Sequence, residues 1–124
     1  RMESDIFNVF MKGLSNDSTE LQIRWKPTNT IGVVLVSEGY PGDYETGVEI
    51  SGLPDVSNDV TVYHSGTDFS KTGSVVTSGG RVLTVVAESD DLMVAKTKCY
   101  QAIENISFTG MSYRRDIANE TEQH

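Results

Sequence analysis

Residues 21–88 form short β-prone runs separated by turn residues, and this pattern constrains the fold more than any other feature. Short runs rich in valine, isoleucine and threonine are typical of strands rather than of helices. The predicted strands are residues 21–25, 31–37, 60–65, 74–77 and 81–88. Paired glycines suit the positive φ angles of a tight hairpin, so Gly79 and Gly80 predict that the last two strands pair antiparallel.

Helical patterns lie on both sides of this β-rich part. Apolar residues recur at three- and four-residue spacing across 4–14, which predicts an amphipathic helix that ends near Gly13. Further along, the hydroxyl of Ser89 and the carboxylates of Asp90 and Asp91 favour the start of a second helix. Its apolar face is expected to hold Leu92, Ala95, Cys99, Ile103 and Ile106. The predicted fold class is α+β, a small and mostly antiparallel β unit with helices packed against it.

Size and charge narrow the classes of protein. A chain of 124 residues is the size of one domain, and its single cysteine excludes an internal disulfide and points to a reducing compartment. A net charge of −8 repels polyanions, so no nucleic acid partner is expected. The longest apolar run, 31–36, is far shorter than the roughly 20 residues of a membrane span, so no membrane association is expected. The first residues lack a signal-peptide pattern, and the expected location is the cytoplasm.

Cys99 and His64 are the residue types of a nucleophilic pair. Cys99 falls on the apolar face of the second predicted helix, where a thiol packs as a small hydrophobic group. A lone strand histidine is commonly a hydrogen-bonded structural residue, but His64 stays a weaker site candidate because Gly66 follows it closely. Asp43 and Glu45 lack partners at metal-ligand spacing, so we expect no metal site in this chain.

The loop after the second predicted strand is rich in glycine. It contains Gly39, Tyr40, Pro41 and Gly42. Its exposed backbone amides suit close approach to a ligand or to another domain, and a plain two-turn connection is the alternative. Long loops on small domains often carry function, so these four residues are candidates for the site.

Arginines are informative because basic residues are few in this acidic chain. Arg81 directly follows Gly79 and Gly80, and Arg114 and Arg115 follow an aromatic residue near the end. A guanidinium can hold phosphate or carboxylate through two parallel hydrogen bonds. The alternative is a surface ion pair, for example between Arg115 and its acidic neighbours. The turn around Arg81 is therefore a candidate site, with Arg114 and Arg115 as weaker candidates.

Five segments in order carry a family resemblance. They read SEGYPGDY at 37–44, GVEISGL at 47–53, YHSGT at 63–67, VVTSGGRVL at 75–83 and GMSYRRDI at 110–117. The chain from about residue 1 to 117 resembles the C-terminal domain of the phosphoribosylamine–glycine ligase family, whose members have an ATP-grasp core. Two positions depart from the family pattern, since Glu38 stands where glycine is usual and Ser78 where asparagine is usual.

The resemblance implies an ATP-dependent ligase of de novo purine biosynthesis. That enzyme joins glycine to 5-phosphoribosylamine, through a glycyl phosphate, to give glycinamide ribonucleotide, ADP and phosphate. The resemblance places ATP and Mg²⁺ (or Mn²⁺) mainly upstream of this chain, so this piece alone is expected to be inactive and to hold no catalytic residue. It implies that the domain packs against the N-terminal and ATP-grasp parts of the same enzyme. The loop Gly39 to Gly42 and the turn Gly79-Gly80-Arg81 are then expected to face the active-site cleft.

The resemblance also suggests boundaries. Residues 1–14 are expected to be a helix leading out of the ATP-grasp core, 15–117 the C-terminal domain with a surface loop at 15–20, and 118–124 a polar tail. The alternative function is a stand-alone, non-catalytic β-rich module that docks a protein partner through the same loops.

Overall fold

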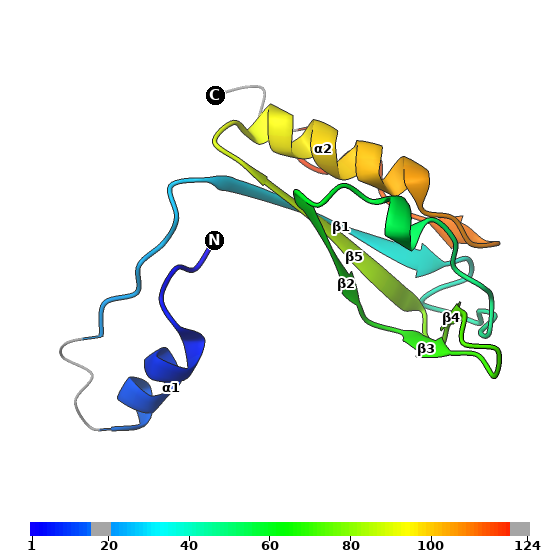
Figure 1. The fold of residues 1–124 in the computed structure, drawn as a ribbon, viewed down its shortest axis with the longest axis horizontal. Coiled ribbons are helices and arrows are strands. Elements are labelled where there is room, and N and C mark those ends of the chain that lie inside the picture. Colours follow the sequence, from blue (N-terminus) through cyan, green and yellow to red (C-terminus); the bar gives the residue numbers. More distant parts are fainter. Residues whose placement is uncertain (16–20, 120–124) are drawn as a thin grey trace.

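The computed structural model describes residues 1–15 and 21–119, so most of the predicted loop 15–20 and the end of the predicted tail lie outside the described residues. Its centre is a four-stranded sheet in the order β2-β5-β1-β6, with antiparallel neighbours. The strands are β1 (Asn29–Ser37), β2 (Val60–His64), β5 (Arg81–Ser89) and β6 (Met111–Ser112). Helix α2 (Leu92–Asn105) covers one face of this sheet (Figure 1), which confirms the predicted α+β class.

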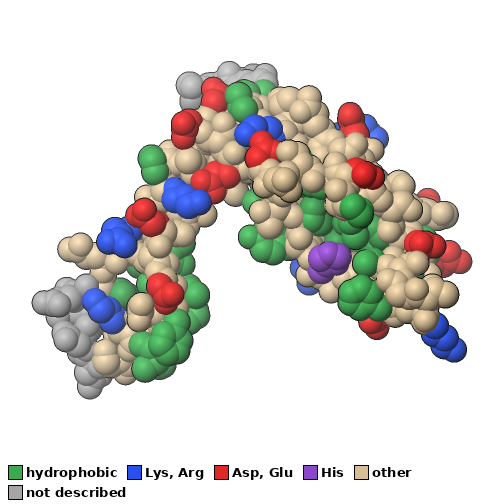
Figure 2. Space-filling model, in the orientation of Figure 1, with side chains coloured by type: hydrophobic (Ala, Val, Ile, Leu, Met, Phe, Trp, Pro, Cys, Tyr) green, Lys and Arg blue, Asp and Glu red, His purple; other side chains and the backbone are tan. Residues whose placement is uncertain are grey.

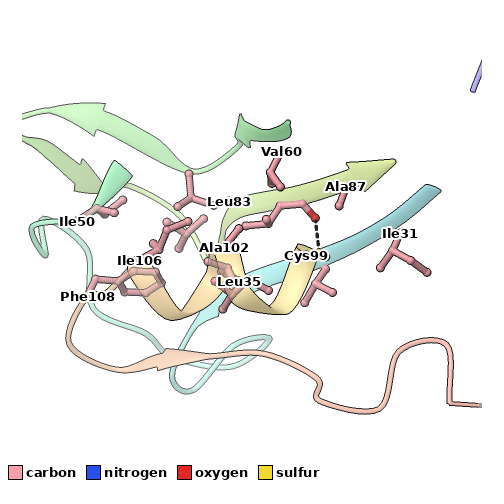
Figure 3. Close-up of a cluster of buried hydrophobic side chains, with 14 of the residues drawn as sticks. Ile31, Leu35, Ile50, Val60, Leu83, Ala87, Cys99, Ala102, Ile106 and Phe108 are labelled. Atoms are coloured by element: carbon pink, nitrogen blue, oxygen red, sulfur yellow. Dashed lines mark hydrogen bonds between the residues drawn. The ribbon is translucent and has the colours of Figure 1, made fainter. Parts of the chain in front are cut away.

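Strand β1 shows why the sheet has one buried face. Ile31, Val33 and Leu35 alternate toward α2 and are buried, whereas Gly32 and Val34 are exposed on the opposite side. Successive residues of a strand point to opposite faces, so one alternating run builds both surfaces. Figure 3 shows the buried side chains of the sheet meeting those of α2 and of the segment that follows it. We call the side without α2, marked by Gly32, Val34 and Thr84, the open face.

Helix α2 begins at a carboxylate cap. The Oδ1 atom of Asp91 accepts hydrogen bonds from the backbone N–H groups of Met93 (2.7 Å) and Val94 (3.0 Å). The predicted capping hydroxyl does not do this, since Ser89 Oγ instead accepts from the N–H of Asp91 at 3.4 Å. A charged acceptor at this end also suits the helix dipole. The predicted apolar face is confirmed, and its buried members within the helix are Ala95, Cys99, Ala102 and Ile103.

The predicted pairing of the last two strands is wrong. Strand β4 (Val75–Thr77) pairs with β3 (Thr67–Phe69) in a separate two-stranded sheet. Both edges of β5 are already taken, by β1 on one side and β2 on the other. A single-turn 3₁₀ helix, η2 (Leu53–Asp55), lies between β1 and β2 in the chain.

The predicted strand at 21–25 is also absent. Trp25 forms an isolated β-bridge to Met2, and residues 21–25 form no other β-pairing with the described residues. The side chains of Ile23 and Trp25 are exposed. Its β-prone composition therefore finds no sheet edge to extend, and composition alone does not make a strand.

Helix α1 (Ile6–Leu14) confirms the predicted amphipathic helix, with Asp5 capping the N–H of Asn8. The expectation that it packs against the sheet is wrong, because none of its residues is buried. Figure 2 shows hydrophobic side chains on the side of α1 that faces the gap between this helix and the sheet. The exposed apolar residues of α1 are Ile6, Phe7, Phe10, Met11 and Leu14. Within 1–15 and 21–119, no helix has the length and apolarity required to cross a bilayer.

Cys99 makes stability depend on pH at the alkaline end. The thiol is fully buried, its Sγ donates to the carbonyl of Val85 at 3.2 Å, and burial raises the pKa of Cys99 to about 11. The unfolded thiol titrates nearer its ordinary value of 9.0, so ionisation favours the unfolded chain above that pH. The stabilising contribution is present in full below pH 9.0 and is lost as the pH rises through about 11.

We therefore expect the free energy of unfolding to fall by ~2–3 kcal/mol between about pH 9 and pH 11, measured by urea denaturation. Cys99→Ala removes this part of the alkaline slope, although the variant starts from a lower plateau because it leaves a small cavity. An unchanged alkaline slope in Cys99→Ala would show that other groups cause the loss.

Candidate functional site

The loop that leaves β1 is tightly wound around a glycine. Gly39 has φ +92°, and a Cβ at this position would lie 1.9 Å from the carbonyl oxygen of Asp43. The N–H of Tyr40 donates to the carbonyl of Ser37 (3.1 Å), and that of Gly42 donates to Gly39 (2.7 Å). The Tyr40–Pro41 peptide bond is cis. Only glycine fits at position 39, so the loop holds a defined path above the strand end.

The second predicted element, Gly79-Gly80-Arg81, is pinned by backbone contacts. A Cβ on Gly66 would lie 2.7 Å from both the Cα of Gly79 and the carbonyl oxygen of Arg81. Gly66 also donates to the carbonyl of Arg81 and accepts from the N–H of Ser78, both at 2.8 Å. Neither Gly79 nor Gly80 has a positive φ. These glycines therefore serve close packing of backbone against backbone, and not the hairpin turn that the sequence suggested.

The two candidate elements meet at the ring of Tyr40. A Cβ on Gly80 would lie 2.1 Å from Cδ2 of Tyr40, so the ring rests directly on the Gly80 backbone. The N–H of Ser37 donates to the carbonyl of Gly80 at 2.9 Å and ties the end of β1 to the same turn. Segments more than forty positions apart in the sequence are thus joined at one end of the sheet.

Two cavities open beside this junction on the open face. The first, of about 610 Å³, is lined mainly by polar groups, and we call it the polar cavity. Its polar side chains are Tyr40, Tyr44, Ser65, Arg81 and Thr84, and Val34, Gly66 and Gly80 complete it. The second, of about 410 Å³, is more apolar and includes Tyr113, Arg114 and Ile117. Tyr40, Val34 and Arg81 line both, and both volumes are typical of ligand sites.

The arginines differ in whether they are already engaged. Arg114 holds Asp116 through two hydrogen bonds, Nε to Oδ1 at 2.9 Å and Nη2 to Oδ2 at 2.6 Å, which lowers the pKa of Asp116. The guanidinium of Arg115 lies 5.1 Å from the centroid of the Tyr113 ring, a cation–π contact, and not in the suggested ion pair. Within the described chain, no carboxylate or hydrogen-bond acceptor engages the side chain of Arg81, which is exposed. Arg81 is the arginine best placed to receive an anion.

The remaining sequence candidates line neither of these two cavities. His64 is exposed, its Nδ1 lies 2.9 Å from Thr67 Oγ1, and it lines neither cavity, so its geometry is that of a surface hydrogen bond. Pro41, Gly42 and Gly79 shape the backbone without lining either cavity. Gly39 lines a separate cavity.

That separate cavity is acidic. It measures about 490 Å³ and is lined by the carboxylates of Glu38, Asp43 and Glu45, with Gly39 and Gly110 among its other residues. Within 1–15 and 21–119, no three histidine, cysteine, aspartate or glutamate side chains come together as a metal site.

Sequence reasoning missed several lining residues. Tyr44, Ser65, Gly66 and Thr84 join the polar cavity from the loop, the end of β2 and the middle of β5. Thr84 had a usable signal, because it sits at an outward position of an alternating strand. Ser65 and Gly66 had none, since their place beside the Gly79 turn depends on contacts that only the fold creates.

Comparison with known proteins places this geometry in a family. The family model described as "Phosphoribosylglycinamide synthetase, C domain" matches residues 30–120. The phosphoribosylamine–glycine ligase of Caldanaerobacter subterraneus subsp. tengcongensis is 41% identical over 117 residues, which cover 94% of this chain and 28% of the relative. That of Neisseria meningitidis serogroup A is 42% identical over 120 residues, covering 96% and 28%. The chain thus spans little more than a quarter of the length of these curated relatives.

A solved structure matches as well. The crystal structure of phosphoribosylamine–glycine ligase from Thermotoga maritima superimposes with a TM-score of 0.74 at 32% sequence identity. The match covers 91% of this chain and 27% of that one. Sequence and fold therefore agree on the same relatives.

Proposed function

Since the chain belongs to the phosphoribosylglycinamide synthetase family as its C domain, we propose that it completes the active site of a phosphoribosylamine–glycine ligase. The complete enzyme joins glycine to 5-phosphoribosylamine at the expense of ATP, in de novo purine biosynthesis in the cytoplasm. ATP and Mg²⁺ (or Mn²⁺) bind mainly to the other parts of that enzyme. The observation that carries the proposal is the junction of the Tyr40 loop and the Gly80 turn, with the unengaged Arg81 beside it.

The junction supports a role in holding a substrate. Arg81 stands at the start of β5 and lines the polar cavity together with the Tyr40 ring, so its planar guanidinium and the ring lie beside the same space. Holding a reactant in one orientation lowers the entropic part of the barrier to reaction. The described residues thus bind and orient, while the bond-making groups belong to other parts of the enzyme in this proposal.

The exposed apolar surfaces support packing against the rest of the ligase. Phe7 and Phe10 on α1 are 66% and 62% exposed, and the open face adds Val34 and Tyr63. Apolar surface of this extent commonly marks an interface. We propose that the N-terminal and ATP-grasp parts cover it, with 1–14 as the connecting helix, 15–117 as the C-terminal domain and 118–124 as its tail.

The alternative of a stand-alone interaction module rests on the same exposed loops. The named relatives are ligases that match this chain over more than nine-tenths of its length, which favours the ligase. The test is an assay of the complete protein for glycinamide ribonucleotide, with ATP, glycine or phosphoribosylamine left out in turn. Product that requires all three supports the proposal, and its absence in a folded protein excludes it.

A variant at the junction gives a sharper expectation. Gly80→Ala places a methyl group where the Tyr40 ring lies, so the ring and its loop must move. We expect kcat/KM of the complete ligase to fall about 10- to 100-fold, as small misplacements of binding groups do. The control is Gly13→Ala, since Gly13 lies in α1 with nothing within 4 Å of an added Cβ. An equal effect of both variants, or a fully active Gly80→Ala, would contradict the role of the junction.

A further inference from the structure

We propose that the polar cavity binds the phosphate of a sugar phosphate, which in the ligase is the 5-phosphate of phosphoribosylamine. Naming that substrate rests on the proposed function, whereas the preference for a phosphate monoester rests on the cavity itself. Glycine and the phosphates of ATP then bind elsewhere in the enzyme.

The cavity supplies donors and leaves them unused. The guanidinium of Arg81 and the hydroxyls of Ser65 and Thr84 line it, and none of the three side chains hydrogen-bonds to another described residue. Tyr44 adds a phenolic hydroxyl in the same state. A phosphate monoester presents three acceptor oxygens and takes more donors at once than a carboxylate, which has two oxygens. The number of donors therefore favours phosphate.

The distribution of charge points the same way. No carboxylate lines the polar cavity, although the chain has 18 acidic and 10 basic residues. The acidic side chains of this loop, Glu38, Asp43 and Glu45, line the separate cavity instead. The acidic side chains of the loop are therefore not part of the lining that contains Arg81. The family departure at Glu38 does not place a carboxylate in the lining of the polar cavity.

The same charge distribution favours a sugar phosphate over the other substrates. The ammonium group of glycine calls for a nearby carboxylate, and a magnesium nucleotide calls for oxygen ligands to its cation. The polar cavity has no carboxylate in its lining to serve either group. The adjoining apolar cavity has a second guanidinium, Arg114, but Asp116 already holds it.

The walls of the polar cavity are fixed before a ligand arrives. Gly66 packs against Gly79, and Tyr40 rests on Gly80, so the turn that carries Arg81 has little freedom to shift. A backbone that is already in place loses less entropy on binding than a mobile one. Affinity for a phosphate group then depends on Arg81 more than on movement of the loop.

The test uses the complete protein and ribose 5-phosphate as the probe, with ribose as the uncharged control. In Arg81→Ala we expect the dissociation constant of ribose 5-phosphate by calorimetry, and the KM for phosphoribosylamine, to rise about 10- to 100-fold. KM values for glycine and ATP should change less than about twofold, because the lost interaction concerns a different substrate. Arg81→Lys keeps the charge without the planar fork, so it should recover part of the loss.

Lys71→Ala is the matched control, because it removes one positive charge from an exposed residue outside both cavities. It should leave all three KM values and the probe affinity unchanged. A rise in the KM for glycine or ATP alone in Arg81→Ala overturns the proposal, and so does unchanged binding of ribose 5-phosphate. If the complete protein makes no glycinamide ribonucleotide, the proposed function fails, yet probe binding that is lost in Arg81→Ala still supports a phosphate site.

Discussion

Replacing Leu35 with alanine should lower the free energy of unfolding by about 3–5 kcal/mol, the upper part of the range for buried leucines. Leu35 is 0% exposed and lies in β1 beneath α2, opposite Leu83 of β5. Figure 3 shows it at the centre of the cluster that joins the sheet to the helix. A rigid sheet on one side and a helix on the other leave little room for collapse around the missing atoms. Urea denaturation of the variant and of the parent chain measures the difference.

Val34→Ala is the control for this variant. Val34 is the next residue along the same strand, but it points to the open face and is 39% exposed. Its loss removes strand propensity and a little buried area, so we expect the free energy of unfolding to fall by no more than about 1 kcal/mol. Equal destabilisation by the two variants would mean that the core does not lie between the sheet and α2.

Gly52→Ala should destabilise the chain by roughly 3 kcal/mol or prevent its folding, for two reasons that act together. Gly52 has φ +81°, which an alanine adopts only with strain. Its Cβ would also lie 1.7 Å from the carbonyl oxygen of Asn105, the last residue of α2. The carbonyl belongs to the backbone and the position of a Cβ is set by the backbone, so neither can rotate away. The segment before η2 would have to separate from the end of the helix.

Gly47 separates these two causes. It has φ +79°, but nothing lies within 4 Å of an added Cβ. Gly47→Ala therefore measures the backbone strain alone, about 1 kcal/mol, and the excess in Gly52→Ala measures the close approach. Thermal unfolding of the two variants side by side gives the comparison. If both variants melt at the same temperature, the close approach to Asn105 does not contribute to the loss of stability.

Local pattern was sufficient for the elements that build the core. The alternation in β1 and β5 and the apolar face of α2 each indicate which residues are buried. Burial of these apolar side chains stabilises all three elements. Segment 21–25 has similar composition but reaches no free sheet edge, so the same local signal failed there. Short β3 carried too few residues to show a period. Pairing partners depend on the whole topology, which is why β4 was assigned to β5.

The candidate site was foreseen in its parts and not in its assembly. Tyr40 and Arg81 could be proposed from residue type and from the family resemblance. The structural need for a glycine at position 80 could not be proposed, because it comes from the Tyr40 ring that rests on Gly80 and not from the turn. Ser65 and Thr84 line the cavity because Ser65 directly follows β2 and Thr84 lies in the neighbouring strand β5. A cavity formed by separate segments becomes visible only when the segments are brought together.

The register of β1 with β5 has a consequence for the order of folding. It pairs Asn29 with Ser89 and Ile31 with Ala87, so the central ladder joins residues far apart in the chain. Contacts of long sequence separation slow folding, because a large loop must close before they form. The buried face of β1 also has no cover until α2 exists. During synthesis, β1 therefore has no partner strand until Ser89 has left the ribosome and no complete cover until about residue 105 has followed, so we expect the core to form late.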